Sequence, residues 1–226
     1  MLLAIDTATQ TMSLAIFDGR AILAEQSWPT ANNHSIQLGP TVQNLLAHCD
    51  ITVKDLTALA VCTGPGSYSG LRVGVAFAKG LASVHRLPLV GIGSLDIIAA
   101  AQLHYSDGLI VLVQVGRGRV VVGRYQWRKN HWINRGEAQI MDWDTLMASI
   151  DGSAHITGEV NEIGHEAIVR AQASGVPVTL VPAANRLRRA GFLAEEAWNR
   201  IHERQEFFDA SKVLPFYVKT LDVPET

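Results

Sequence analysis

The segment CTGPGSYSGLRVG, residues 62–74, constrains the fold more than any other part of this 226-residue chain. Its glycines and its proline interrupt the chain between an apolar run that ends at Val61 and a second apolar run that follows Gly70. This pattern predicts a strand, a tight turn and a helix, an arrangement with which many proteins bind a phosphate group. The first question is therefore whether the turn binds a ligand or serves the packing of the chain.

The turn lacks residues that three well-known ligand-binding or catalytic turns require. A Walker A loop has Lys and then Ser or Thr after its last glycine, whereas Leu71 and Arg72 follow Gly70. A Rossmann turn needs closer glycines and an acidic residue on a later strand, and Asp96 falls on the wrong element. The nucleophile elbow G-x-S-x-G does not fit around Ser69. The alternative is that the glycines permit positive φ and a close approach of the helix.

Small side chains recur every four residues along the helix predicted for residues 70–85. The stripe consists of Gly70, Gly74, Ala78 and Ala82, and small residues at this spacing let another backbone come near. The helix carries few charges and bulky apolar residues on its other faces. We therefore expect it to be covered by its own domain or by a partner protein.

The remaining pattern predicts an α/β protein of two lobes, residues 1–104 and 105–226. In the first lobe we expect strands at 2–5, 12–17, 21–28, 55–62 and 88–92 and helices at 36–49, 70–85 and 94–104. In the second lobe we expect strands at 109–115, 120–127, 132–140, 155–157 and 177–181 and helices at 142–150, 161–174 and 186–204. Strands that alternate with helices in this order predict mixed sheets with helices packed on them.

The composition is that of a folded globular protein without a general affinity for nucleic acids or membranes. Hydrophobic residues make up 48% and charged residues 18% of the chain, and the net charge is −2. Cys49 and Cys62 are too few for a disulfide framework, so we expect buried free thiols. The apolar start is too short for a signal peptide, and no run reaches the length of a membrane span. We therefore expect a soluble cytoplasmic protein.

Four segments together resemble the bacterial TsaB (YeaZ) family. They are LLAIDTATQTMSLAIF at the start, NHSIQLGPTVQNLL, CTGPGSYSGLRVGVAFAKGLA and PFYVK near the end. The resemblance is dense over the first hundred residues and thin over the second half. It implies an actin-like ATPase (ASKHA) fold of two related lobes, each with a mixed β-sheet flanked by helices. The second lobe would be smaller and degenerate, with the C-terminal helix or tail able to pack back on the first.

The resemblance also implies a function. Proteins of this family act in making N6-threonylcarbamoyladenosine at position 37 of tRNAs that read ANN codons. A TsaB-like protein is there a non-catalytic scaffold or activator that binds the catalytic paralogue TsaD, and a TsaE-like ATPase joins the complex. The resemblance implies no cofactor for this chain alone, ATP and Mg²⁺ only within the complex, and tRNA contact only through it. The alternative is an independently active nucleotide hydrolase or glycoprotease-like enzyme of the same superfamily.

The histidines argue against such an enzyme. Proteins that resemble TsaD carry an H-x-x-x-H pair after the matching turn, and two imidazoles one helical turn apart can share a metal ion. Ser94 and Ile98 stand in those two places here. None of the eight histidines forms a pair spaced by four residues. We therefore predict no catalytic residues and no metal site.

The segment Asp6-Thr7-Ala8-Thr9 has two interpretations. It resembles the first phosphate loop of actin-like ATPases, which makes Asp6, Thr7 and Thr9 candidate nucleotide-binding residues. Alternatively, it is a hairpin turn whose side chains bond to the backbone.

We predict that two helices form the face that binds the TsaD-like partner and that makes a homodimer when the chain is alone. The predicted interface residues are His34, Leu38, Val42, Leu45, Gly70, Leu71, Gly74, Phe77, Ala78 and Leu81. A basic strand pair offers a further alternative, either direct tRNA binding or a solvated sheet edge. Its residues are Arg117, Arg119, Arg124, Arg128 and Lys129.

Overall fold

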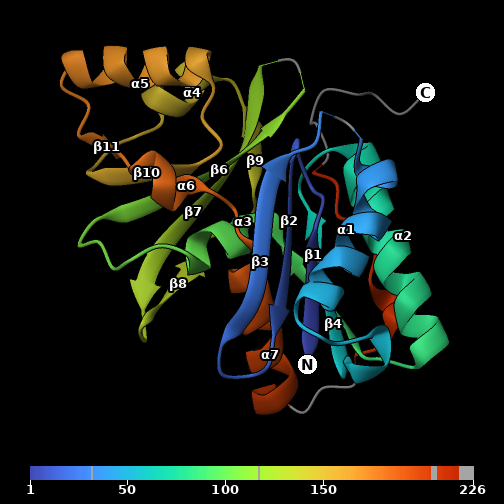
Figure 1. Ribbon diagram of the computed structural model, residues 1–226. Coiled ribbons are helices and arrows are strands. Elements are labelled where there is room, and N and C mark those ends of the chain that lie inside the picture. Colours follow the sequence, from blue (N-terminus) through green and yellow to red (C-terminus); the bar gives the residue numbers. More distant parts are fainter. Residues whose placement is uncertain (32, 117, 205–207, 219–226) are drawn as a thin grey trace. The chain divides into compact units, whose positions relative to one another are not determined.

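The computed structural model describes residues 1–31, 33–116, 118–204 and 208–218, which form two compact units (Figure 1). Unit 1 consists of residues 1–97 and 188–216, and unit 2 consists of residues 98–187 with the described residues after Phe216. The long C-terminal helix therefore groups with the N-terminal residues, and residues 98–104 group with unit 2. Each unit contains its own sheet and its own core.

Unit 1 contains a mixed sheet in the order β3-β2-β1-β4-β5. Its strands are β1 (Leu2–Asp6), β2 (Thr11–Phe17), β3 (Ile22–Pro29), β4 (Ala58–Gly64) and β5 (Leu89–Gly93). The first three strands pair antiparallel, and β4 and β5 continue the sheet in parallel beside β1. The β2–β3 hairpin turns at Asp18, whose carboxylate accepts the backbone N–H groups of Arg20 and Ala21. These two hydrogen bonds lower the pKa of Asp18, and the one from Ala21 has the larger effect.

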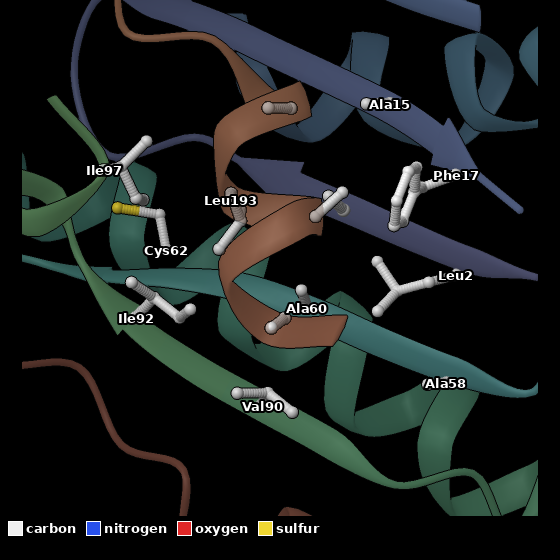
Figure 2. Close-up of a cluster of buried hydrophobic side chains, with 14 of the residues drawn as sticks. Leu2, Ala15, Phe17, Ala58, Ala60, Cys62, Val90, Ile92, Ile97 and Leu193 are labelled. Carbon is white, nitrogen blue, oxygen red and sulfur yellow. The ribbon is translucent and has the colours of Figure 1, made fainter. Parts of the chain in front are cut away.

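Helices cover both faces of this sheet. On one face lie α1 (His34–His48) and α2 (Tyr68–His85), and on the other lies α7 (Ala190–Arg204). Alternate residues of a strand point to opposite faces, so Leu3 and Ile5 pack under α1 and α2 while Leu2 and Ala4 pack under α7. Figure 2 shows Leu193 of α7 against the strands. A strand buried on both faces needs the continuous apolar sequence that β1 has.

Unit 2 repeats this plan. Its sheet order is β11-β10-β6-β7-β8, with β9 also paired to β7. The strands are β6 (Gly108–Val115), β7 (Arg119–Arg128), β8 (His131–Asn134), β9 (Gln139–Met141), β10 (Ala154–Gly158) and β11 (Val178–Leu180). The helices α4 (Trp143–Ala148) and α5 (Glu162–Ala173) share a core with this sheet, and α6 (Ala183–Arg186) follows β11.

The two sheets have the same topology. In each, the first three strands are antiparallel, and two parallel strands follow beside the first strand, each preceded by a helix. The remaining short elements are the 3₁₀ turns at Val53–Asp55 and Ala210–Lys212 and the helix α3 (Ser94–Ala100). The prediction of two related mixed sheets flanked by helices is confirmed.

Three predicted elements differ most from the structure, and the strand expected at 55–62 is also shifted, to Ala58–Gly64. The strand expected at 132–140 is two strands, because Gly136 adopts a φ of 143° and its N–H binds the Asn134 side chain. The helix expected at 94–104 ends at Ala100. The helix expected at 186–204 begins at Ala190, because the side chains of Ser13 and Glu25, far away in sequence, accept the first N–H groups of α7.

Two glycines of α2 provide a matched test of this packing. A Cβ atom at Gly74 would lie 2.2 Å from Oγ1 of Thr7, whereas one at Gly80 would meet no atom within 4 Å. We expect Gly74→Ala to destabilise the protein by roughly 1–3 kcal/mol through overpacking. Gly80→Ala should stabilise it by up to about 1 kcal/mol through helix propensity. Urea unfolding of both variants checks this, and equal effects would contradict the packing of α2 on Thr7.

Candidate functional site

The loop between β1 and β2 carries three of the predicted site residues. Asp6 and Thr7 are fully buried and Thr9 is nearly so. Oδ1 of Asp6 accepts the backbone N–H of Ala8 at 2.9 Å, which closes a tight turn of the loop on itself. The loop therefore has the side chain-to-backbone bonding of the second interpretation, and its remaining polar atoms need buried partners.

Arg188 supplies those partners. Its Nε donates to Oδ2 of Asp6 at 2.5 Å, and a terminal nitrogen donates to Oγ1 of Thr9 at 2.9 Å. Arg188 is only 4% exposed, so the ion pair lies in the interior of unit 1. Arg188 stands two residues before α7 and 182 residues from Asp6. The guanidinium thus places a fixed positive charge beside the carboxylate, where a phosphate loop would hold a hydrated metal ion.

The glycine turn packs directly on the same loop. Oγ1 of Thr7 donates to the carbonyl oxygen of Gly70 at 2.7 Å. A Cβ atom at Gly66 would lie 2.1 Å from the carbonyl oxygen of Ala8, and one at Gly70 would lie 2.2 Å from that of Thr7. Gly64 also adopts a φ of 109°, which favours glycine. The glycines thus serve the close approach of two loops within unit 1.

Cys62 lies at the end of β4 beside this cluster. It is fully buried. Its pKa is raised well above the usual 9.0, mainly by burial and secondly by the nearby carboxylate of Asp6. A buried thiol with a raised pKa has little thiolate and is a poor nucleophile or metal ligand. Cys62 therefore belongs to the core of unit 1.

The positions compared with a histidine pair are structural. Oγ of Ser94 donates to the carbonyl oxygen of Pro65 at 2.6 Å, and Ile98 is buried. His34, predicted at the interface, is buried, and its Nε2 donates to the carbonyl oxygen of Thr9 at 2.7 Å. Within residues 1–31, 33–116, 118–204 and 208–218, no three His, Cys, Asp or Glu side chains are arranged to hold a metal ion. The same ranges contain no helix with both the length and the apolar character to cross a bilayer.

The predicted interface residues mostly face inward. The buried ones are His34, Leu38, Val42, Leu45, Gly70, Leu71, Gly74 and Ala78. Phe77 and Leu81 are half-buried, and Phe77 lies near Gly39 where α1 meets α2. Other atoms of unit 1 cover these side chains, so their burial needs no partner. The partner interface itself stays a prediction.

Sequence reasoning missed the outward face of α2. Arg72, Ala76, Gly80 and Val84 also recur every four residues, and all four are exposed. They are offset by two positions from the buried stripe, about 200° around the helix. The four-residue spacing of small side chains was the right signal for the buried face; on the outward face it is limited to Ala76 and Gly80, between Arg72 and Val84.

The basic strand pair does not present all its charges on one face. Arg119 is half-buried, Arg124 donates to Oγ of Ser149 at 2.7 Å, and Arg128 and Lys129 are exposed. Arg117 lies outside the described residues. Because side chains alternate along a strand, Arg119 lies on the opposite face of β7 from Arg124 and Arg128.

The buried ion pair yields a prediction about stability. We expect Arg188→Ala to lower the free energy of unfolding by about 3–5 kcal/mol, because Asp6 is then a buried charge without its counter-ion. Arg189→Ala is the matched control, since Arg189 is 48% exposed and its partner Glu25, 12% exposed, keeps the N–H of Gly191 as a hydrogen-bond donor. The control should lose about 1 kcal/mol or less. Urea unfolding measures both, and equal losses would contradict the assigned role of Arg188.

Cys62 yields a prediction about reactivity. Because its pKa is raised, thiolate does not form in the folded protein near pH 8.5, and we expect iodoacetamide to modify Cys62 only after unfolding. Cys49 is partly exposed and should react in the folded state. Mass spectrometry of a time course locates the label, with Cys49→Ala as control. Rapid labelling of Cys62 in the folded protein would show that the site opens to solvent.

Comparison with known proteins places this architecture among characterised folds. Residues 27–177, more than half of the chain, match the family described as "TsaD: tRNA N6-adenosine threonylcarbamoyltransferase". The tRNA threonylcarbamoyladenosine biosynthesis protein TsaB of Bacillus subtilis is 39% identical over 128 residues, which cover 56% of each chain. The chain therefore spans about half the length of the curated relative it matches.

Solved structures match over nearly the whole chain. YeaZ from Pseudomonas aeruginosa superimposes with a TM-score of 0.75 at 22% identity, over 96% of this chain and 99% of that one. A dehydratase activator from Clostridium difficile, solved with bound ADPNP, gives a TM-score of 0.50 at 11% identity, over 90% and 96% of the two chains. The fold is thus the actin-like ATPase fold that the sequence predicted. The chain belongs to the TsaD-related family whose model it matches, and it is similar to the curated proteins named TsaB and, in fold, to YeaZ.

Proposed function

We propose that this chain is a scaffold or activator subunit in the biosynthesis of N6-threonylcarbamoyladenosine at position 37 of tRNAs that read ANN codons. It binds a TsaD-like catalytic subunit, which a TsaE-like ATPase joins, and the tRNA is bound by the assembled complex. Membership of the TsaD-related family and the similarity to proteins named TsaB support this role. Any ATP and Mg²⁺ belong to the complex rather than to this chain alone.

The observation that carries the proposal is the outward surface of α1 and α2. The two helices pack together. Each has a large apolar side chain exposed, Ile36 near the start of α1 at 72% and Val84 near the end of α2 at 77%. Between the ends of α2, Ala76 and Gly80 have small side chains and leave a low surface, which Arg72 and Val84 border in the same stripe. Small residues on an exposed face allow a partner helix to come close, and a contact that buries Ile36 or Val84 would be favourable.

The site geometry supports a role without chemistry of its own. The polar atoms of Asp6 and Thr9 already bond to Arg188, so they are not directed at an open cavity. Without its partner, the same face of α1 and α2 forms a symmetric homodimer, because an isologous contact covers both copies at once.

The outer stripe gives a direct test. We expect Gly80→Arg to abolish capture of the TsaD-like protein of the same cell and to convert the homodimer to monomer, since a long charged side chain occupies the low surface. Gly80→Ala keeps the surface low and should bind normally. Ile163→Arg on α5 is the matched control, because Ile163 is an exposed apolar residue on a helix of unit 2. Pull-down and sedimentation measure the two associations.

Different outcomes would contradict different parts of the proposal. Normal binding by folded Gly80→Arg would exclude this interface. Equal threonylcarbamoylation of tRNA by the TsaD-like protein with and without this chain would exclude the activator role. Hydrolysis of ATP or of a glycoprotein by the isolated chain would favour the enzyme alternative.

A further inference from the structure

A pocket of about 520 Å³ lies entirely within unit 2, apart from the features considered so far. It is bordered by the segment before β6, the end of β7 and the loop before β10. Its volume lies in the range of small-molecule sites. β6 pairs with β7 from Val115, which faces Arg119, to Leu109, which faces Tyr125, and no further. The last residues of β7 therefore extend past β6, and the consecutive residues from Arg124 to Trp127 all line the pocket.

Two arginines line this pocket, and each donates a hydrogen bond to an uncharged side chain. Arg124 donates to Oγ of Ser149 at 2.7 Å, and Arg135 donates to Oε1 of Gln126 at 2.5 Å. In the part of the chain that the structure describes, neither guanidinium forms an ion pair. Each keeps its full charge and further N–H groups, and guanidinium groups in this state bind phosphate well.

Aromatic rings line the pocket and are held in place from behind. Trp132 is buried, and the rings of Trp127 and Tyr105 pack against it with centroids 5.4 and 6.1 Å away. Tyr105 also stacks on His155 at 4.0 Å, and His104 lies over Trp127 at 5.0 Å. Trp127, Tyr105 and His104 line the pocket. Rings fixed in this way are ready to stack with another flat ring.

A carboxylate completes the set. Asp107 lines the pocket, and its oxygen is 3.9 Å from Nδ1 of His155, too far for a hydrogen bond. Nδ1 of His155 is buried and has no hydrogen-bond partner among the described residues. His155 does not line the pocket, whereas the Asp107 carboxylate does and can accept a hydrogen bond from a ligand there. A donor group beside an aromatic ring, such as the amino group of a nucleobase, would satisfy this carboxylate.

We propose that this pocket binds one unpaired nucleotide of RNA. The phosphate lies at Arg124 and Arg135, the base stacks with the rings beside Trp127, and an exocyclic amino group of the base meets Asp107. This goes beyond the proposed function, because the chain itself then contributes one contact to the RNA. A single nucleotide gives weak binding, so the contact contributes mainly once a partner has bound the same RNA.

The five tryptophans of the chain allow a residue-specific test. The probe is a single-stranded heptaribonucleotide of mixed sequence, added at millimolar concentration to the ¹⁵N-labelled full chain. We expect the indole N–H signal of Trp127, assigned with Trp127→Phe, to shift on titration, while that of Trp198 in unit 1 does not. Arg124→Ala should weaken binding about tenfold and reduce the slope of log K against log salt by about 0.7, the effect of one phosphate contact to a single strand. Arg124→Lys should restore part of the salt dependence.

A steric variant tests the pocket without removing any contact. A Cβ atom at Gly108 would meet only the carbonyl oxygen of Ser153, at 3.9 Å, so Gly108→Met fits and fills the pocket. It should abolish the shift of Trp127. Gly116→Met, just past the other end of the same strand, is the matched control, because a Cβ atom at Gly116 would meet no atom of the described residues within 4 Å. Arg170→Ala, whose guanidinium pairs with Asp144 on the surface, is the control for loss of charge.

Four results would overturn the proposal. They are an unshifted Trp127 signal in the folded chain, equal binding by Arg124→Ala, tighter binding of free AMP than of the heptamer, and equal binding of a fully paired RNA hairpin. Signal dispersion in the same spectra reports whether each variant is folded. The readout needs no partner protein, so failure here leaves the assembly proposed above untouched, and failure of that assembly leaves this site intact.

Discussion

The ion pair between Asp6 and Arg188 is the interaction on which the rest of unit 1 depends. It joins the end of β1 to the residues just before α7, 182 positions apart in the chain. A buried pair of this kind stabilises little compared with an apolar replacement of the same shape, but removing one partner is costly because it leaves an unpaired buried charge. We infer that it sets where α7 begins and which of its faces meets the sheet. The hydrogen bonds from the N-terminus of α7 to Ser13 and Glu25 act in the same direction.

The same ion pair constrains the loop that the glycine turn contacts. Asp6 and Thr9 are held from one side by Arg188, and Thr7 is held from the other by the carbonyl oxygen of Gly70. Any side chain added at Gly66 or Gly70 would collide with the backbone of this loop. The glycine-rich turn, the loop after β1 and the start of α7 therefore form one packed assembly within unit 1. Its polar groups are satisfied by one another.

Local patterns in the sequence predicted the elements of the fold but not the long-range contacts. Runs such as Leu2–Ile5 are apolar without interruption because helices cover both sheet faces, and this pattern is visible in the sequence. The start of α7 was placed too early because its caps come from strands more than 160 residues away. Arg188 carried no signal either, since only the tertiary fold brings it to Asp6. The prediction of one strand at 132–140 was wrong for a local reason, because the positive φ of Gly136 interrupts the extended chain.

The helix α2 shows why a correct pattern can be assigned to the wrong surface. Residues four apart share a face, so the spacing of Gly70, Gly74 and Ala78 correctly indicated a close approach. The approaching backbone is the loop at Thr7 in the same unit, not a partner. The second stripe, with Ala76 and Gly80, has the same spacing, and a Cβ atom at Gly80 would meet no atom of the described residues within 4 Å. A glycine that costs helix stability without making an intramolecular contact needs another reason to be there. The association proposed for the outer side of α2 supplies that reason, since a partner helix can approach closely only where side chains are small.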